Sequence, residues 1–139
     1  MSGVLLDTHI LIWTLFDRPD LSRYAQELID AADDVFVSVV SIYEIDFKRS
    51  RGGVRAADTY LNRMPANLPA YIPTIGFHLL DIDAEMAWQA ARLPIEHGDP
   101  WDRILVAQAL LRDIPLISAD RRLRQATNAS PLTRSILAF

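Results

Sequence analysis

The chain has 139 residues, 50% of them hydrophobic, which is enough for one globular domain that needs neither a disulfide nor a structural metal. It contains no cysteine, so disulfide frameworks, thiolate catalysis and cysteine-based zinc sites are excluded, and a cytoplasmic location is expected. The net charge of −4 argues against a general nucleic-acid-binding surface, because such binding depends on cations that meet phosphates.

The apolar start of the chain, residues 1–17, is interrupted at Asp7 and His9 and lacks a basic leader and a cleavage site. We interpret it as a strand followed by a helix, and we expect no signal peptide. No apolar run approaches the roughly 20 residues that span a bilayer, so no role in a membrane is expected. Residues 1–139 are expected to form one domain.

Short apolar runs alternate with amphipathic segments, a pattern that favours an α/β fold around a parallel sheet. The run GVLL at 3–6 predicts a buried strand. Residues 8–16 are apolar almost throughout, as expected for a helix packed on the sheet. A second helix is predicted at 21–32, with Ser22 available as its N-cap.

The middle of the chain begins with VFVSVV at 35–40, a β-branched run that predicts a strand. Residues 41–50 then switch to a helical pattern that Gly52 and Gly53 terminate. Another helix is predicted at 58–64. Three prolines punctuate the connection that follows it: Pro65, Pro69 and Pro73.

A strand is predicted at 77–83 and a helix at 84–93. Residues 99–113 form the clearest predicted helix, because Asp99 can cap it and Pro100 suits its first position. A short strand at 115–118 and a short helix at 119–126 follow. The tail contains an apolar run that fits either an edge strand or a helical turn.

Four acidic residues stand at the ends of these elements. Asp7 and Asp120 follow predicted strands, and Glu44 and Asp102 lie in the first turns of predicted helices. Ligand sites in open parallel sheets form at the carboxyl ends of the strands, so Asp7 and Asp120 are expected to share one edge. Glu44 and Asp102 join them there if their strands are parallel to the others.

Carboxylates gathered at one edge repel one another unless a cation neutralises them, and oxygen ligands suit Mg²⁺ or Mn²⁺. A histidine-based zinc site is poorly supported, because His9, His78 and His97 are scattered. A metal centre of this kind suits phosphodiester hydrolysis, since the ion holds a phosphate oxygen and lowers the pKa of an attacking water.

Each acid also has a purely structural interpretation. Ser41 and Glu44 match the S-x-x-E capping box, and Asp99 and Asp102 both favour a helix start. The order of the strands decides between the two interpretations, because only a shared edge brings the acids together.

Other polar and aromatic residues near these positions are weaker candidates. Thr8 and Ser118 suit helix caps or turns, or they hold a water or phosphate beside the acids. His97 fits either a proton carrier or a surface loop. Trp101 fits either the core or a base-stacking platform.

Thirteen of the 14 basic residues are arginines, and two clusters stand out. One comprises Lys48, Arg49, Arg51 and Arg55, and the other comprises Arg121, Arg122 and Arg124. Each cluster suits either RNA phosphates beside the acids or an ordinary solvated helix face. The predicted RNA-binding residues are Lys48, Arg49, Arg51 and Arg121.

The stretches LLDTHILIW, SIYEI, HGDPWDRILVAQA and PLISADRRL, in this order over nearly the whole chain, resemble the PIN-domain family. The resemblance is greatest to the VapC toxins of bacterial toxin–antitoxin pairs. It implies a three-layer α/β/α fold with a mainly parallel central sheet and a Mg²⁺- or Mn²⁺-dependent endoribonuclease site. The family's acids fall on four positions: Asp7, Glu44, Asp102 and Asp120.

Of these acids, the expected metal ligands are Asp7, Asp102 and Asp120, and the expected supporting residues are Thr8, Ser118 and Asp99. The resemblance also implies a homodimer and inhibition by a small VapB-like antitoxin. The C-terminal segment of such an antitoxin covers the acidic site, often with an arginine.

Two alternatives remain open at this point. A receiver-like phosphoacceptor domain also places acids at the ends of parallel strands, but it needs a lysine near the site, and Lys48 is the only lysine. A catalytically silent PIN-like module would keep the pocket to bind a partner.

Overall fold

A computed structural model describes residues 2–51, 61–133 and 137–138 of the chain. Its centre is a five-stranded sheet with the order β3-β2-β1-β4-β5, and every pair of neighbouring strands is parallel. The strands are β1 (Gly3–Leu6), β2 (Asp34–Ser38), β3 (His78–Leu80), β4 (Leu116–Ile117) and β5 (Leu137–Ala138).

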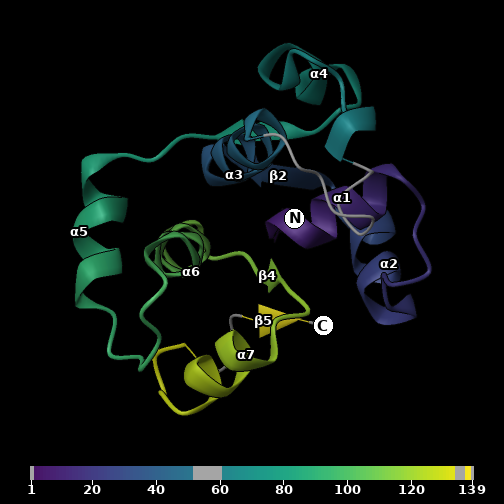
Figure 1. Cartoon of the computed structure of the whole chain (residues 1–139). Coiled ribbons are helices and arrows are strands. Elements are labelled where there is room, and N and C mark those ends of the chain that lie inside the picture. Colours follow the sequence, from purple (N-terminus) through teal and green to yellow (C-terminus); the bar gives the residue numbers. More distant parts are fainter. Residues whose placement is uncertain (1, 52–60, 134–136, 139) are drawn as a thin grey trace.

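Helices cover both faces of this sheet. They are α1 (Thr8–Leu15), α2 (Arg23–Ala31), α3 (Val39–Ser50), α4 (Leu68–Thr74), α5 (Ala84–Arg92), α6 (Pro100–Arg112) and α7 (Arg121–Asn128). In Figure 1, α5 and α6 lie to the left of the strands and α1 and α2 to the right. No helix in the described part of the chain is long and apolar enough to cross a membrane.

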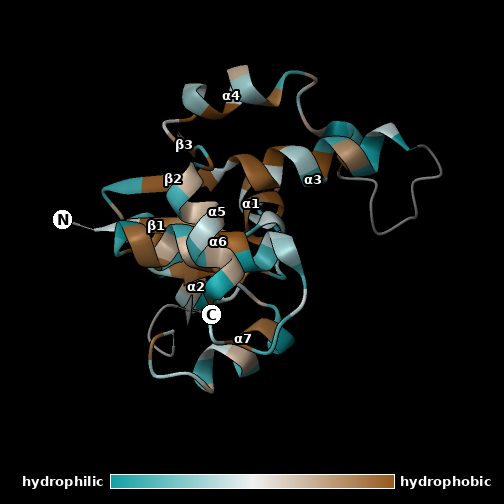
Figure 2. Ribbon diagram, turned by 90° about the vertical axis from the view of Figure 1, so that its left-hand side faces the viewer, coloured by the Kyte–Doolittle hydropathy of each residue, from teal (hydrophilic) through white to brown (hydrophobic). Residues whose placement is uncertain are grey.

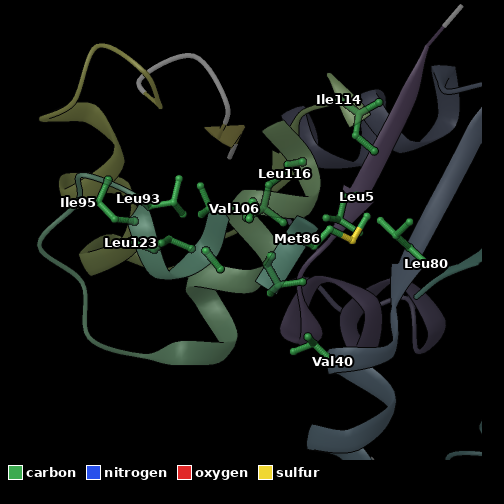
Figure 3. Packing of buried hydrophobic residues seen from close by; sticks show 14 residues of the cluster. Leu5, Val40, Leu80, Met86, Leu93, Ile95, Val106, Ile114, Leu116 and Leu123 are labelled. Atoms are coloured by element: carbon green, nitrogen blue, oxygen red, sulfur yellow. The ribbon is translucent and has the colours of Figure 1, made fainter. Parts of the chain in front are cut away.

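Two hydrophobic clusters separate the layers, because successive side chains of a strand point to opposite faces. Leu5 of β1 packs with Val106 of α6 on one face, in a cluster that α5 and α7 also join (Figure 3). Leu6 of β1 packs on the other face in a cluster that includes residues of α1, α2, α3 and α4. The predicted three-layer α/β/α fold with a parallel sheet is therefore confirmed.

The register of the sheet aligns the strand ends that matter for function. Leu6 pairs with Val37 of β2 on one side and with Ile117 of β4 on the other. The residues that follow these strand ends therefore emerge at one edge of the sheet, as the sequence predicted for Asp7 and Asp120.

The second strand ends earlier than its composition suggested, and the helix after it begins at Val39. Ser38 is the N-cap, because its Oγ accepts the Val40 amide at 3.1 Å. The predicted Ser41–Glu44 capping box is therefore wrong, since Ser41 lies one turn inside α3. The β-branched pair Val39 and Val40 looked like strand, but Val40 is buried from the helix against the core.

The proline-containing connection after residue 64 includes a helix that the sequence did not predict. Asn67 caps α4, and Leu68 and Ile72 fill the core at i,i+4 spacing. Pro69 lies in the first turn, where an amide has no partner within the helix, so the proline costs little there. The helix predicted at 58–64 lies partly outside the described residues, as do Gly52 and Gly53, and residues 61–63 form a 3₁₀ turn.

Strand β5 is the last described element and lies at the edge of the sheet. Strand β5 pairs in parallel with β4, with Leu116 opposite Leu137. Of the two alternatives for the tail, the edge strand is therefore confirmed.

Candidate active site

All four predicted acids line one cavity of about 370 Å³ at the carboxyl edge of the sheet. Asp7 follows β1, Asp120 follows β4, Glu44 comes from the second turn of α3, and Asp102 comes from the first turn of α6. Asp99, Thr8 and His9 line the same cavity. The strand order thus brings together residues as far apart in the chain as Asp7 and Asp120, which are separated by 113 positions.

Asp7 is the most buried of the four acids, with 8% of its surface exposed. Its Oδ1 accepts the Ile10 amide at 2.9 Å and so caps α1. Burial raises the pKa of Asp7 to about 6, although hydrogen bonds from Ser118 and Ile10 oppose the shift. The negative charge of Asp102 raises this pKa further, which shows that the two carboxylates interact.

Ser118 connects two of the acids. Its buried Oγ accepts the backbone amide of Asp120 at 3.1 Å, and its hydroxyl hydrogen bonds to Asp7. Asp120 in turn caps α7 through the Leu123 amide at 3.1 Å. Ser118 thus contacts the carboxyl group of Asp7 and the backbone of Asp120.

Thr8 holds the Glu44 carboxylate by a hydrogen bond. The Thr8 hydroxyl donates to Glu44 Oε1 at 2.7 Å and lies 3.0 Å from the hydroxyl of Ser41. Both hydroxyl residues are buried. This chain of three side chains joins the start of α1 to α3 and fixes one oxygen of the Glu44 carboxylate.

Asp102 is held by His97, whose Nε2 lies 2.8 Å from Asp102 Oδ2. The His97 side chain is only 10% exposed, so it is not a surface loop histidine. Burial raises the pKa of Asp102, the bond to His97 opposes this, and the charges of Asp99 and Asp120 add to the rise. Asp99 also caps α6, since its Oδ1 accepts the amides of Trp101 and Asp102.

Arg103 holds the loop that carries His97, and sequence reasoning did not identify it. Its guanidinium donates to backbone carbonyl oxygens at distances between 2.8 and 3.4 Å. These carbonyls belong to Ala90, Ala91, Leu93, Ile95 and His97. The only sequence signal was an arginine at the start of an otherwise apolar helix.

A second cavity, of about 930 Å³, opens beside the first and shares Asp99, Asp102 and Asp120 with it. Its wall continues over His97 and the loop before α6 to Arg122 and the outer side of α7. The three shared acids therefore line both cavities, and Arg122 lines the larger one.

The predicted RNA-binding residues fall into different environments. Lys48 and Arg51 are exposed at the end of α3, and Arg121 is exposed at the start of α7. Arg49 differs, because its side chain is 13% exposed and pairs with Asp46. Its guanidinium also donates to the carbonyls of Met64, Pro65 and Ala66 and so anchors the segment before α4.

The donor set fits a hard divalent cation, because carboxylate oxygens dominate the polar lining of the smaller cavity. The raised pKa of Asp7 points the same way, since a positive charge beside it would relieve the cost of burying a carboxylate. No three acidic or histidine side chains in residues 2–51, 61–133 and 137–138 converge closely enough to hold an ion in this arrangement.

Comparison with known proteins identifies relatives over nearly the whole chain. The PIN domain family model matches residues 4–129. Ribonuclease VapC22 of Mycobacterium tuberculosis is 31% identical over 134 residues, which cover 96% of this chain and 98% of that protein.

Solved structures share the fold at lower identity. A structure of VapBC2 from Rickettsia felis bound to a DNA fragment from their promoter matches with a TM-score of 0.64 and 14% identity, covering 99% of this chain and 98% of that chain. A toxin–antitoxin complex from Klebsiella pneumoniae matches with a TM-score of 0.62 and 20% identity, covering 98% and 96%.

Proposed function

The chain belongs to the PIN-domain family, and on that premise we propose that it is a Mg²⁺- or Mn²⁺-dependent endoribonuclease that acts as the toxin of a VapBC-type pair. The observation that carries this proposal is the cavity lined by Asp7, Glu44, Asp102 and Asp120. The named ribonuclease relative, which matches over nearly the full length, supports the same activity. The whole chain, residues 1–139, would act as one cytoplasmic domain.

In this proposal Asp7, Asp102 and Asp120 hold the cation. When bound, the cation lowers the pKa of a water and offsets negative charge on the scissile phosphate. Each of the three carboxylates already has one oxygen engaged, with Ile10, His97 and Leu123 respectively. These bonds fix the side chains, and the Ser118 hydroxyl also holds Asp7.

Glu44 orients the attacking water and takes its proton. Thr8 leaves one Glu44 oxygen for this purpose, because it binds the other at 2.7 Å. Ser118 and Asp99 act as supporting residues: Ser118 holds Asp7 and Asp120 together, and Asp99 fixes the first turn of α6 that carries Asp102.

The exposed cations Lys48, Arg51 and Arg121 are the residues that we propose for RNA phosphates on either side of the acids. We leave Arg49 out of this set, because its donors already bind carbonyl oxygens of the chain.

A VapB-like antitoxin is the proposed partner. The similar solved structures include VapBC and toxin–antitoxin complexes, which supports a partner of this kind. The cavity of about 930 Å³ offers acidic groups, including Asp102 and Asp120, to a basic C-terminal segment of the partner. We also propose that the protein forms a homodimer.

The test of the proposal is cleavage of a labelled RNA with Mg²⁺, with Mn²⁺ and with excess chelator. We expect cleavage with either metal and none with chelator, and we expect Asp7→Asn to cleave with neither. A purified protein that binds RNA but leaves it intact with both metals would instead be a silent PIN-like module.

A further inference from the structure

A row of exposed rings runs along α3. Tyr43 is 49% exposed and Phe47 is 42% exposed. Their ring centroids lie 5.5 Å apart with planes 20° from parallel, and Tyr43 also lies 5.1 Å from Trp101 of α6. We call Trp101, Tyr43, Phe47 and Arg51 the aromatic strip, because the Arg51 guanidinium stacks over the Phe47 ring at 4.4 Å.

The inner end of the strip is adjacent in the chain to two of the acids, although its rings are not among the residues that line the acidic cavity. Tyr43 directly precedes Glu44, and Trp101 directly precedes Asp102. The outer end lies about 12 Å further along α3, since Tyr43 and Arg51 are eight residues apart. Figure 2 shows α3 running outward from the sheet, with hydrophobic and hydrophilic bands along its length.

Positive charge accompanies the rings. Lys48 and Arg51 are exposed near the outer end, although the chain as a whole carries a net charge of −4. The acid on the same turn, Asp46, is paired with Arg49 at 2.9 Å. The strip thus combines flat apolar surfaces with cations, beside an otherwise acidic site.

We propose that the aromatic strip stacks the bases of single-stranded RNA and leads the strand into the acidic cavity. Every base presents a π-face, so stacking on Tyr43 and Phe47 tolerates any sequence, while Lys48 and Arg51 meet the phosphates. This inference rests on the proposed function and specifies how that site takes its substrate: as an unpaired strand with its bases exposed. A paired strand keeps its bases stacked on one another and offers the rings no free face.

The test compares two oligonucleotides of the same length in the non-cleaving Asp7→Asn background. One is a single-stranded RNA, and the other is an abasic strand with the same number of phosphates. Binding is measured by fluorescence anisotropy for the parent and for Tyr43→Ala and Phe47→Ala. We expect each substitution to weaken RNA binding by about tenfold and to leave abasic-strand binding unchanged, because base stacking alone is lost.

The chain offers a matched control. Trp88 of α5 is 59% exposed and carries the Arg92 guanidinium over its ring at 4.3 Å, but α5 carries none of the four acids. Trp88→Ala should leave binding of both strands unchanged. Tyr43→Phe keeps the ring and should bind RNA as the parent does.

Several outcomes would overturn the inference. Equal losses on both strands would mean that the rings act through structure or charge. Unchanged RNA affinity together with a change in oligomeric state would assign the strip to contact between copies, and a loss confined to antitoxin binding would assign it to that partner. If the wild type cleaves RNA while Tyr43→Ala binds normally, the strip is wrong and the proposed function stands. If the wild type neither binds nor cleaves RNA, both are wrong.

Discussion

Thr8 donates a hydrogen bond of 2.7 Å to Glu44, which lies 36 positions away in the chain. The bond crosses from the helix after β1 to the helix after β2, and both residues line the acidic cavity. A threonine that looks like an ordinary helix-start residue thus fixes one oxygen of a carboxylate that lines the cavity.

Replacing Thr8 with Val should separate orientation from shape, because Val keeps the volume and removes the hydroxyl. We expect cleavage to fall by about 10- to 100-fold, the usual cost of losing a partner that orients a ligand at a metal site. Stability should fall by about 1–3 kcal/mol, since the buried Ser41 hydroxyl loses a partner. Steady-state cleavage and urea unfolding measure the two effects. Thr8→Ser restores the hydroxyl and should recover most of both; a Ser variant as slow as Val would contradict this role.

Asp7→Asn should stabilise the metal-free protein at neutral pH. The pKa of Asp7 rises from 3.8 to about 6 on folding, so the folded state binds the proton more tightly than the unfolded state. Wild-type stability should therefore decrease as the pH rises from 3.8 to about 6 and stay low above that. At pH 8 the variant should be more stable by about 2–3 kcal/mol, the free energy that corresponds to this pKa difference. Asn still accepts the Ile10 amide, so the α1 cap survives.

Melting curves in chelator at pH 5 and pH 8, followed by curves with Mn²⁺, test this prediction. Added Mn²⁺ should reverse the order of stability, because the wild type gains binding free energy that the variant loses. Identical responses of the two proteins to pH and to Mn²⁺ would remove Asp7 from the metal site.

The cations at the end of α3 should respond differently to alanine. Lys48→Ala and Arg51→Ala should weaken RNA binding and each reduce the salt slope by about 1, as expected for phosphate contacts. Arg49→Ala should instead destabilise the fold, since its guanidinium binds Asp46 and the carbonyls of residues 64–66. Binding titrations at several salt concentrations, paired with unfolding curves, distinguish the two behaviours. An Arg49→Ala protein with wild-type stability and a reduced slope would return Arg49 to the RNA-binding set.

Cleavage products should carry a 5′ phosphate and a 3′ hydroxyl. This outcome follows if Glu44 directs a water at the phosphate, because the ribose 2′-OH then takes no part. End-group analysis by mass spectrometry decides the matter. A 2′,3′-cyclic phosphate would show that the ribose itself attacks, and Glu44 would then have a different task.

The acidic cavity was predictable because its members follow strands or open helices, positions that have clear sequence signals. Asp7, Asp99 and Asp120 are helix caps and also line the acidic cavity, so the structural interpretation of these acids is confirmed and does not exclude the functional one. Whether these acids meet depends on the order and direction of the strands. They meet because β1 lies between β2 and β4 and runs parallel to both.

Other features had no readable signal. Helix α4 contains two prolines, and the core contacts of Leu68 and Ile72 outweigh their unfavourable propensity. Arg49 and Arg103 bind backbone carbonyl oxygens. Every residue has a carbonyl oxygen, so the pattern of side chains in the sequence cannot predict which ones an arginine will bind. The sequence assigned Arg49 to RNA binding and gave Arg103 no role, and only the fold shows the carbonyl oxygens around them.

In the loop that Arg103 holds, residues whose carbonyl oxygens bind Arg103 alternate with exposed residues. Leu93, Ile95 and His97 give their carbonyl oxygens to Arg103, whereas the residues between them, at 94, 96 and 98, are exposed. All of residues 94–98 line the larger cavity. Backbone oxygens do not change with the side chain, so the exposed positions can be replaced while the loop keeps its path. Substitutions at these exposed positions can therefore reshape the wall of the larger cavity while the acids it shares with the smaller cavity stay in place.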